Sequence, residues 1–169
     1  LEQVSIKVPA ILILAELFNP EDIAFVLGLG MTLRASKEET KWIETLIEVK
    51  ALWQQDPDFS RRFDWAQTLA NHRSHACFEV IFSKLPAEDK LKNTSLLTQT
   101  AKSLEAHIER LHKKQPLCQA KDLAELGIKP GKKMGLLLET ASRLSVDYDL
   151  QTRDEVLQRL LQDSIWNDS

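Results

Sequence analysis

Apolar residues recur along this chain with the period of an α-helix. Lysine, arginine and glutamate fill the face opposite the longest apolar stripe. That stripe, with spacings of four, three, four and three residues, consists of Leu97, Ala101, Leu104, Ile108 and Leu111. The pattern predicts a single helix with one buried and one solvated side, ended by Pro116.

Signals for the start of a helix appear at several places. Asn19-Pro20-Glu21-Asp22 offers a capping side chain, a proline and two acids in the order typical of a first turn. Ser36–Glu39 and Thr152–Glu155 have the sequence of capping boxes, in which two side chains bond to backbone N–H groups reciprocally. Behind the first box, the expected buried face consists of Trp42, Leu46, Val49 and Trp53.

The remaining periodic segments complete an all-α prediction. Helices are expected at residues 60–71, 75–85 and 119–126, and from Lys132 to about Val146. No segment shows the alternation of a half-buried strand. We therefore predict an irregular array of about seven to nine helices.

A polar segment from Pro86 to Asn93 predicts a boundary within this array, because Thr94 or Ser95 could cap the helix that follows. The expected division is a helical body-like subdomain at residues 1–90 and a helical tail-like subdomain at residues 91–169, which contains a Gly-Pro-Gly hairpin.

The composition indicates a folded protein, since 43% of the residues are hydrophobic and 28% are charged. The net charge of −3 argues against a protein that coats nucleic acid with its whole surface. Residues 102–143 nevertheless contain nine basic and five acidic side chains. An anionic ligand is therefore expected to bind in the C-terminal half of the chain.

The cysteines and two of the histidines indicate structural roles. Cys77 and Cys118 belong to no CxxC pair, which predicts reduced thiols in a cytoplasmic protein. Cys77 precedes Phe78 and is expected to be a small core residue. His72 and His75 have a spacing that suits a metal on a helix face, but no second ligand cluster completes the site. A structural or surface role is favoured over zinc binding.

No catalytic centre is visible in the sequence. Paired carboxylates on an extended segment, a Walker loop, GxGxxG and GxSxG are all absent. His107 and His112 flank Arg110 on a charged helix, and we expect both histidines to be solvated. The chain by itself is therefore not expected to be an enzyme.

One corner concentrates residues that permit unusual backbone conformations. The segment Gly127–Glu139 holds three of the five glycines, one proline and two adjacent lysines. Gly127 is placed to end the preceding helix in a left-handed conformation, with Ile128 folding back as an apolar contact. The turn at Pro130 and Gly131 is then expected to lead into a helix that begins at Lys132.

This corner has the components of a phosphate-binding site. Free N–H groups at a helix start, the positive end of the helix dipole and nearby lysines all favour an anion, and Gly135 would permit close approach by another helix or a nucleic-acid backbone. The candidate RNA-phosphate-binding residues, including three from an earlier helix, are Arg110, Lys113, Lys114, Lys129, Gly131, Lys132, Lys133 and Gly135. The alternative, an ordinary loop with solvated lysines, stays open.

Four segments in consistent order carry a family resemblance. Met31–Glu38 has a Leu-Arg-x-Ser start of a helix, and Asp64–Leu69 is an aromatic-led helix segment. Lys121–Leu138, the most specific, has Gly-x-x-Pro-Gly followed by glycine and leucine, and Leu150–Glu155 leads into a last helix. Together they resemble the C-terminal, non-catalytic region of the bacterial tRNA nucleotidyltransferase and poly(A) polymerase family, the relatives of CCA-adding enzymes. One departure is Lys132-Lys133, where that family often has Gly-Pro.

The resemblance implies a module that binds tRNA or another RNA and positions it for nucleotide addition at the RNA 3′ end. In that family the catalytic carboxylates lie in an N-terminal head that uses magnesium with ATP or CTP. Nothing in this chain matches the head, so we expect the head to be absent from this chain. The head would then act as a partner domain and would hold the cofactors. A cytoplasmic location without a membrane partner is expected, since the apolar run Ala10–Leu17 is too short to span a bilayer.

The main alternative is a helical protein-interaction or scaffold module that does not bind nucleic acid. Large aromatic side chains often anchor protein partners. The residues that would serve are Trp42, Trp53, Trp65 and Trp166. A self-sufficient enzyme is a third hypothesis, which no group of residues supports.

Overall fold

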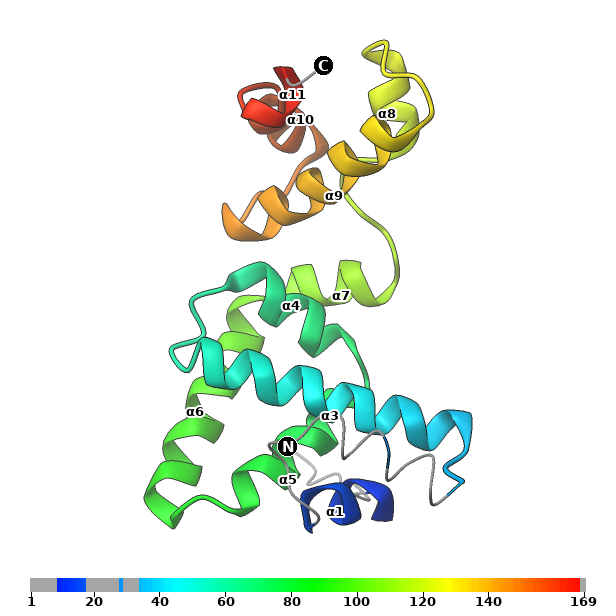
Figure 1. The fold of residues 1–169 in the computed structure, drawn as a ribbon. Coiled ribbons are helices and arrows are strands. Elements are labelled where there is room, and N and C mark those ends of the chain that lie inside the picture. Colours follow the sequence, from blue (N-terminus) through cyan, green and yellow to red (C-terminus); the bar gives the residue numbers. More distant parts are fainter. Residues whose placement is uncertain (1–8, 18–27, 29–33, 168–169) are drawn as a thin grey trace. The chain divides into compact units, whose positions relative to one another are not determined.

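The computed structural model describes residues 9–17, 28 and 34–167 (Figure 1). This part of the chain forms ten helices and no strand, which confirms the all-α prediction at a count slightly above the expected range. No helix within it is long and apolar enough to cross a membrane. The helix start predicted at Asn19–Asp22 and the Met31–Leu33 part of the family-like segment lie outside the described residues.

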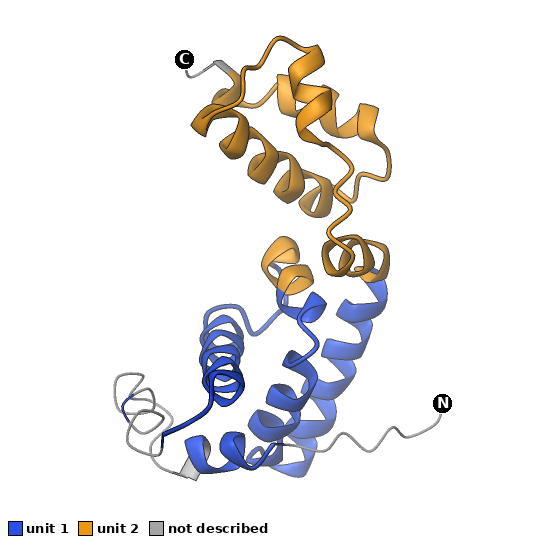
Figure 2. Ribbon diagram, turned by 90° about the vertical axis from the view of Figure 1, so that its right-hand side faces the viewer, with its two compact units in different colours: residues 1–60, 68–103 blue, residues 61–67, 104–169 orange. Residues whose placement is uncertain are grey.

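The chain forms two compact units, coloured separately in Figure 2. Unit 1 comprises residues 1–60 and 68–103, and unit 2 comprises residues 61–67 and 104–169. These units differ from the two predicted subdomains. The polar segment predicted as a boundary begins helix α6 (Ala87–Ser103), because proline fits directly before a first turn and acidic residues favour its positive end.

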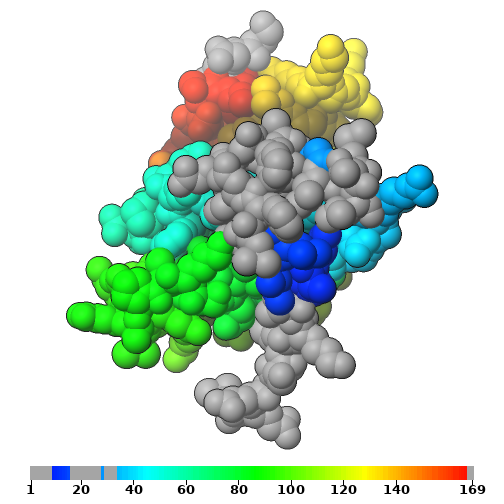
Figure 3. Space-filling view, turned by 60° about the horizontal axis from the view of Figure 1, so that its bottom comes forward, coloured from blue at the N-terminus to red at the C-terminus, as the bar shows by residue number. Residues whose placement is uncertain are grey.

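Unit 1 is built around α3 (Lys37–Gln55), which contacts α1 (Ala10–Leu17) and α5 (Ser74–Ser83). The capping box at Ser36 is confirmed, since Ser36 N–H donates to Glu39 Oε2 at 2.8 Å and Glu39 N–H donates to Ser36 Oγ at 3.2 Å. Atoms of α1 reach the surface in Figure 3. Within this helix Ile13 is half exposed.

The predicted buried face of α3 was only partly right. Leu46 and Val49 are buried as expected, together with Ile43 and Leu52. Trp42 and Trp53 are half-buried instead. The Trp53 ring lies edge-on to Phe82, and its Nε1–H donates to Asn93 Oδ1 at 3.4 Å. Tryptophan has an apolar body and a polar N–H, so it suits the rim of a core better than its centre.

The predicted helix through residues 97–111 divides at Leu104. This residue leaves the helical region with φ −105° and ψ 6°, and α7 (Glu105–His112) begins after it. The break is also where the chain passes from unit 1 to unit 2. Leu97 and Leu104 are buried, whereas Ile108 is half-buried, so the regular spacing predicted an apolar face correctly but not a continuous helix.

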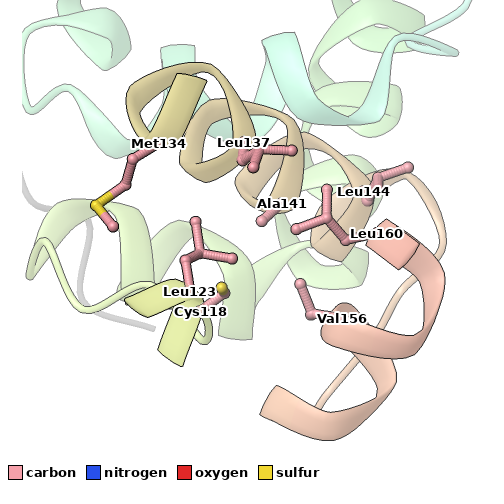
Figure 4. Close-up of a cluster of buried hydrophobic side chains, with 8 residues drawn as sticks. All are labelled: Cys118, Leu123, Met134, Leu137, Ala141, Leu144, Val156 and Leu160. Carbon is pink, nitrogen blue, oxygen red and sulfur yellow. The ribbon is translucent and has the colours of Figure 1, made fainter. Parts of the chain in front are cut away.

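Unit 2 is centred on α9 (Lys132–Asp147), which contacts α8 (Ala120–Glu125) and α10 (Arg153–Leu161). Figure 4 shows α9 side chains at spacings of three, four and three residues facing side chains of the neighbouring segments. This buried cluster consists of Cys118, Leu123, Met134, Leu137, Ala141, Leu144, Val156 and Leu160. The short α11 (Ser164–Asn167) follows α10, and Trp166 packs against the cluster.

The first residues of α4 (Arg62–Ala70) also belong to unit 2. Phe63 N–H donates to Asp147 Oδ1 at 3.1 Å, and Arg62 Nε donates to the Val146 carbonyl at 3.1 Å. The Arg143 guanidinium lies 4.5 Å from the centre of the Phe63 ring. These contacts attach the start of α4 to the C-terminal half of α9.

The capping box at Thr152 leads to a pH-dependent prediction. Glu155 Oε2 accepts from the N–H groups of Gln151 and Thr152, each at 2.9 Å. These bonds, of which the one from Gln151 has the largest effect, hold the pKa of Glu155 below its ordinary value. Ionised Glu155 therefore stabilises the folded state above its unfolded pKa, and this contribution is lost as the pH falls through its folded pKa.

Glu155→Gln is expected to lower the free energy of unfolding at neutral pH, and the difference from the unmutated chain should shrink in acid. Urea unfolding at both pH values measures this difference. An equal difference at neutral pH and well below the carboxyl pKa would contradict the assignment.

Candidate nucleic-acid interface

Helix α8 ends as the sequence predicts, in a left-handed glycine. Gly127 has φ 85°, its N–H donates to the Ala124 carbonyl at 2.9 Å, and the Ile128 N–H donates to the Leu123 carbonyl at 3.0 Å. These two bonds form a Schellman motif. Ile128 packs against the buried cluster that contains Leu123, so the predicted apolar contact of the cap is present.

Helix α9 begins at Lys132, as predicted, with an N-terminus that no side chain caps. Gly131 is the N-cap residue and makes no side-chain hydrogen bond, and the first backbone bond joins Gly135 N–H to the Gly131 carbonyl at 3.1 Å. The N–H groups of the first turn consequently have no intrahelical partner. By contrast, α3 and α10 begin with capping boxes and acidic first turns.

The charge at the start of α9 has the sign that disfavours a helix N-terminus. Lys132 and Lys133 occupy the first turn, which contains no acid. A cation at this end of the dipole typically costs about 0.3–1 kcal/mol. Lys129 and Lys132 are exposed and Lys133 is half-buried, and none of the three ammonium groups has an ion-pair partner among the described residues. This end of α9 is therefore well suited to an anion.

Gly135 lies one turn into α9 on the exposed surface. A Cβ atom built there meets nothing within 4 Å among the described residues. Packing inside unit 2 therefore does not require a glycine at this position, and the close approach of another helix that the sequence allowed is not observed there. The lack of a side chain leaves the backbone beside Lys132 accessible.

Replacement of Gly127 and of Gly135 by alanine should change the free energy of unfolding in opposite directions. Gly127→Ala forces a side chain into a left-handed conformation and is expected to destabilise the chain by about 1–2 kcal/mol. Gly135→Ala adds a helix-favouring residue in open space and is expected to stabilise it by about 0.5–1 kcal/mol. Thermal unfolding of both variants tests this difference. A destabilising Gly135→Ala would show that the position has a packing role.

The other three predicted phosphate ligands lie at the end of α7 and are partly engaged within the protein. Lys113 pairs with Glu109, and this bond keeps the pKa of the Glu109 carboxyl low. Arg110 Nη2 lies 2.7 Å from His107 Nδ1, and Arg110 Nη1 donates to Gln151 Oε1 at 3.3 Å. Lys114, in contrast, has no side-chain hydrogen bond or ion pair among the described residues.

The predicted ligands therefore form two groups. Lys132 and Lys133 start α9, with Lys129 and Gly131 just before them. Arg110 and Lys114 instead line a cavity together with Ser142, which is ten residues further along α9 than Lys132. Ten residues of helix span about 15 Å. The structure brings together the residues at 129–135, but it does not place the α7 residues beside them.

His107 was predicted to be solvated, and that prediction was wrong. Its side chain is buried, with 2% of its surface exposed. His107 Nε2 lies 2.7 Å from Asp149 Oδ1. Because arginine can only donate, Nδ1 accepts the Arg110 bond and Nε2 donates to Asp149. This bond is the main reason that the pKa of Asp149 is lowered.

The sequence contained a signal for this burial. His107 is three residues after Leu104 and four before Leu111, so it lies on the apolar side of the stripe. Its partners Asp149 and Gln151 are about forty residues away and could not be found from local spacing. The resulting network fixes the Arg110 guanidinium at one position.

Cys77 is a buried core residue, as predicted, and both Cys77 and Cys118 are free and buried. Burial raises the pKa of the Cys77 thiol to about 12 and that of the Cys118 thiol to about 11. His72 and His75 are exposed, and the His72 ring lies edge-on to Trp42. The described residues contain no group of three or more histidine, cysteine or acidic side chains that could hold a metal ion.

Both thiols should therefore resist alkylation in the folded protein. The thiolate is the reactive form, and at about pH 8 both groups stay protonated and covered. Iodoacetamide followed by mass spectrometry is expected to show slow labelling in buffer and rapid labelling in urea. Equal rates in both conditions would contradict the buried positions.

The four tryptophans proposed as anchors for a protein partner differ in exposure, and none of them is fully exposed. Trp65 is fully buried, and Trp42, Trp53 and Trp166 are half-buried in contacts within their own units. Trp65 is therefore unavailable as an anchor, whereas the other three keep part of their surface accessible, and the scaffold hypothesis stays an open alternative.

Comparison with known proteins found no matching family model, no similar curated protein and no similar solved structure. The resemblance to the tRNA nucleotidyltransferase and poly(A) polymerase family consequently stays a hypothesis based on the segments quoted above.

Proposed function

We propose that unit 2 binds the phosphate backbone of RNA at the α8–α9 corner, defined as residues 129–135. The observation that carries this proposal is the uncapped start of α9 with two lysines in its first turn. The arrangement is unfavourable for an isolated helix, and a bound phosphate would offset the repulsion by accepting from the free N–H groups and pairing with the ammonium groups.

The surrounding sequence favours contacts to phosphates over contacts to bases. No phenylalanine, tyrosine or tryptophan occurs between Phe82 and Tyr148, and one of the two histidines there, His107, is buried. Proteins that read unpaired bases usually stack them on aromatic side chains. A corner with lysines, glycines and free amides is equipped to contact the backbone, which positions an RNA without reading its sequence.

The family resemblance supports a wider proposal. In this account the RNA is a tRNA or another RNA whose 3′ end receives nucleotides, and this chain positions it in the cytoplasm. The catalytic residues, with magnesium and ATP or CTP, would belong to an N-terminal head domain. The contribution of this chain's own residues would be to bind and orient the RNA.

Fluorescence anisotropy with labelled tRNA tests the proposal. Because each neutralised phosphate releases counterions, the logarithm of the association constant should fall linearly with the logarithm of the salt concentration, between roughly 50 and 200 mM salt. An absence of binding at low salt, or binding that salt does not weaken, would contradict a phosphate-backbone contact.

A further inference from the structure

Unit 2 contains a cavity that the proposed RNA contact does not use. Its volume is about 400 Å³, which lies in the range of small-molecule sites. Residues of α7, the segment after it and the C-terminal half of α9 line it, including Arg110, Lys114, Leu117, Ser142, Ser145 and Val146. None of its lining residues is acidic, so two cations face a mostly aliphatic interior.

Lys114 occupies a position that glycine would fill at lower cost. Its N–H donates to the Leu111 carbonyl at 3.1 Å, and the Gln115 N–H donates to the Arg110 carbonyl at 2.9 Å. These are the bonds of a Schellman motif, in which the left-handed residue is usually glycine. Lys114 adopts φ 54° there, a conformation unfavourable for a residue with a Cβ.

Lys114, the strained residue, thus carries a side chain that makes no stabilising polar contact within the described part of unit 2. Gly127 fills the equivalent position at the end of α8. The Lys114 side chain lines the cavity and makes no hydrogen bond or ion pair with the described residues. Strain of this kind persists where the surroundings fix it, and it occurs often at ligand sites. The Lys114 ammonium is therefore available to an anion in the cavity.

Arg110 supplies a second cation whose position is fixed. Its bonds to His107 and Gln151 hold the guanidinium in the cavity wall. The Ser145 hydroxyl donates to the Ser142 carbonyl at 2.7 Å, which leaves the Ser145 oxygen able to accept a bond. A ligand in the cavity would consequently meet two cations together with aliphatic side chains.

We propose that this cavity binds a small organic anion with an aliphatic body, of the class of medium-chain carboxylates. The carboxylate would pair with Lys114 and Arg110, and the hydrocarbon would pack against Leu117 and Val146. The lining contains no phenylalanine, tyrosine or tryptophan, and its one aromatic ring, that of His107, is already bonded to Arg110 and Asp149, which makes the site less suited to a flat nucleobase than to an aliphatic chain. This binding is independent of the proposed RNA contact.

Titration of the full chain with octanoate, followed by two-dimensional NMR of the backbone amides, tests the proposal. We expect saturable shifts at Ser142, Ser145 and Val146. Octan-1-ol lacks the charge and acetate lacks the chain, so each should bind at least about tenfold more weakly. Equal binding of octan-1-ol, or shifts spread over exposed apolar residues such as Leu91 and Leu136, would overturn the proposal.

Variants of Lys114 separate a ligand role from a structural one. Lys114→Gly is expected to raise the urea midpoint by relieving the left-handed strain and to weaken octanoate binding about tenfold or more. Lys114→Gln should weaken binding similarly, whereas Lys121→Gln, an equal charge change at an exposed site on α8, should not. Unchanged octanoate affinity in Lys114→Gln would overturn the assignment.

Discussion

Replacing Leu137 by alanine is expected to destabilise unit 2 by about 2–5 kcal/mol. Leu137 is 1% exposed and lies on the face of α9 directed at the buried cluster. Its neighbours there include Leu123 and Leu160, both with 0% exposure. Removing the isobutyl group would remove apolar burial and leave a cavity that surrounding helices cannot easily fill, because α9 contacts both α8 and α10.

The adjacent residue provides a matched control for this prediction. Leu136 is on the same helix and loses the same atoms on substitution, but it is 50% exposed. Leu136→Ala should change the free energy of unfolding by only about 0.5 kcal/mol. Urea unfolding of the two variants measures the contrast. Equal losses would mean that the assigned face of α9 is wrong.

The second large effect is expected for the double replacement Lys132→Glu and Lys133→Glu, which should weaken RNA binding about a hundredfold or more. Two charge-assisted contacts are lost and two repulsive charges are introduced at the same place. The same change should slightly stabilise α9, since acids favour a helix N-terminus by about 0.3–1 kcal/mol each. A loss of binding could then not be attributed to unfolding.

A control for the effect of net charge alone is a variant in which two lysines far from the corner in sequence are replaced by glutamate. Lys90 and Lys92 are exposed on α6 in unit 1, and Lys90→Glu with Lys92→Glu changes the total charge by the same amount. Anisotropy with labelled tRNA should show a much smaller loss for this pair. Similar losses in both double variants would indicate a general electrostatic effect in place of a contact at the corner.

Local signals predicted the helices well where the stabilising bonds are themselves local. The capping boxes at Ser36 and Thr152 and the left-handed Gly127 each depend on residues within a few positions, and all three are present. The break at Leu104 was not predictable in this way, because it separates helices assigned to different units. Periodicity identifies an apolar face, but it does not report which core that face joins.

The candidate site shows the same limit. The order glycine, lysine, proline, glycine, lysine predicted the turn and the start of α9 correctly, because a turn is encoded by adjacent residues. The grouping of Arg110 with these lysines rested on charge alone. In the structure Arg110 bonds to His107 and Gln151, which the sequence places three and about forty residues away.

The most direct test of the RNA contact is the salt dependence of tRNA binding in a neutralised variant. With Lys132→Gln and Lys133→Gln, we expect the negative slope of log K against log salt to become shallower. Its magnitude should fall by about one per lysine, so by about two in total. The α9 start remains uncapped in this variant, so the measurement isolates the two charges. A slope equal to that of the unmutated chain would show that neither lysine contacts a phosphate.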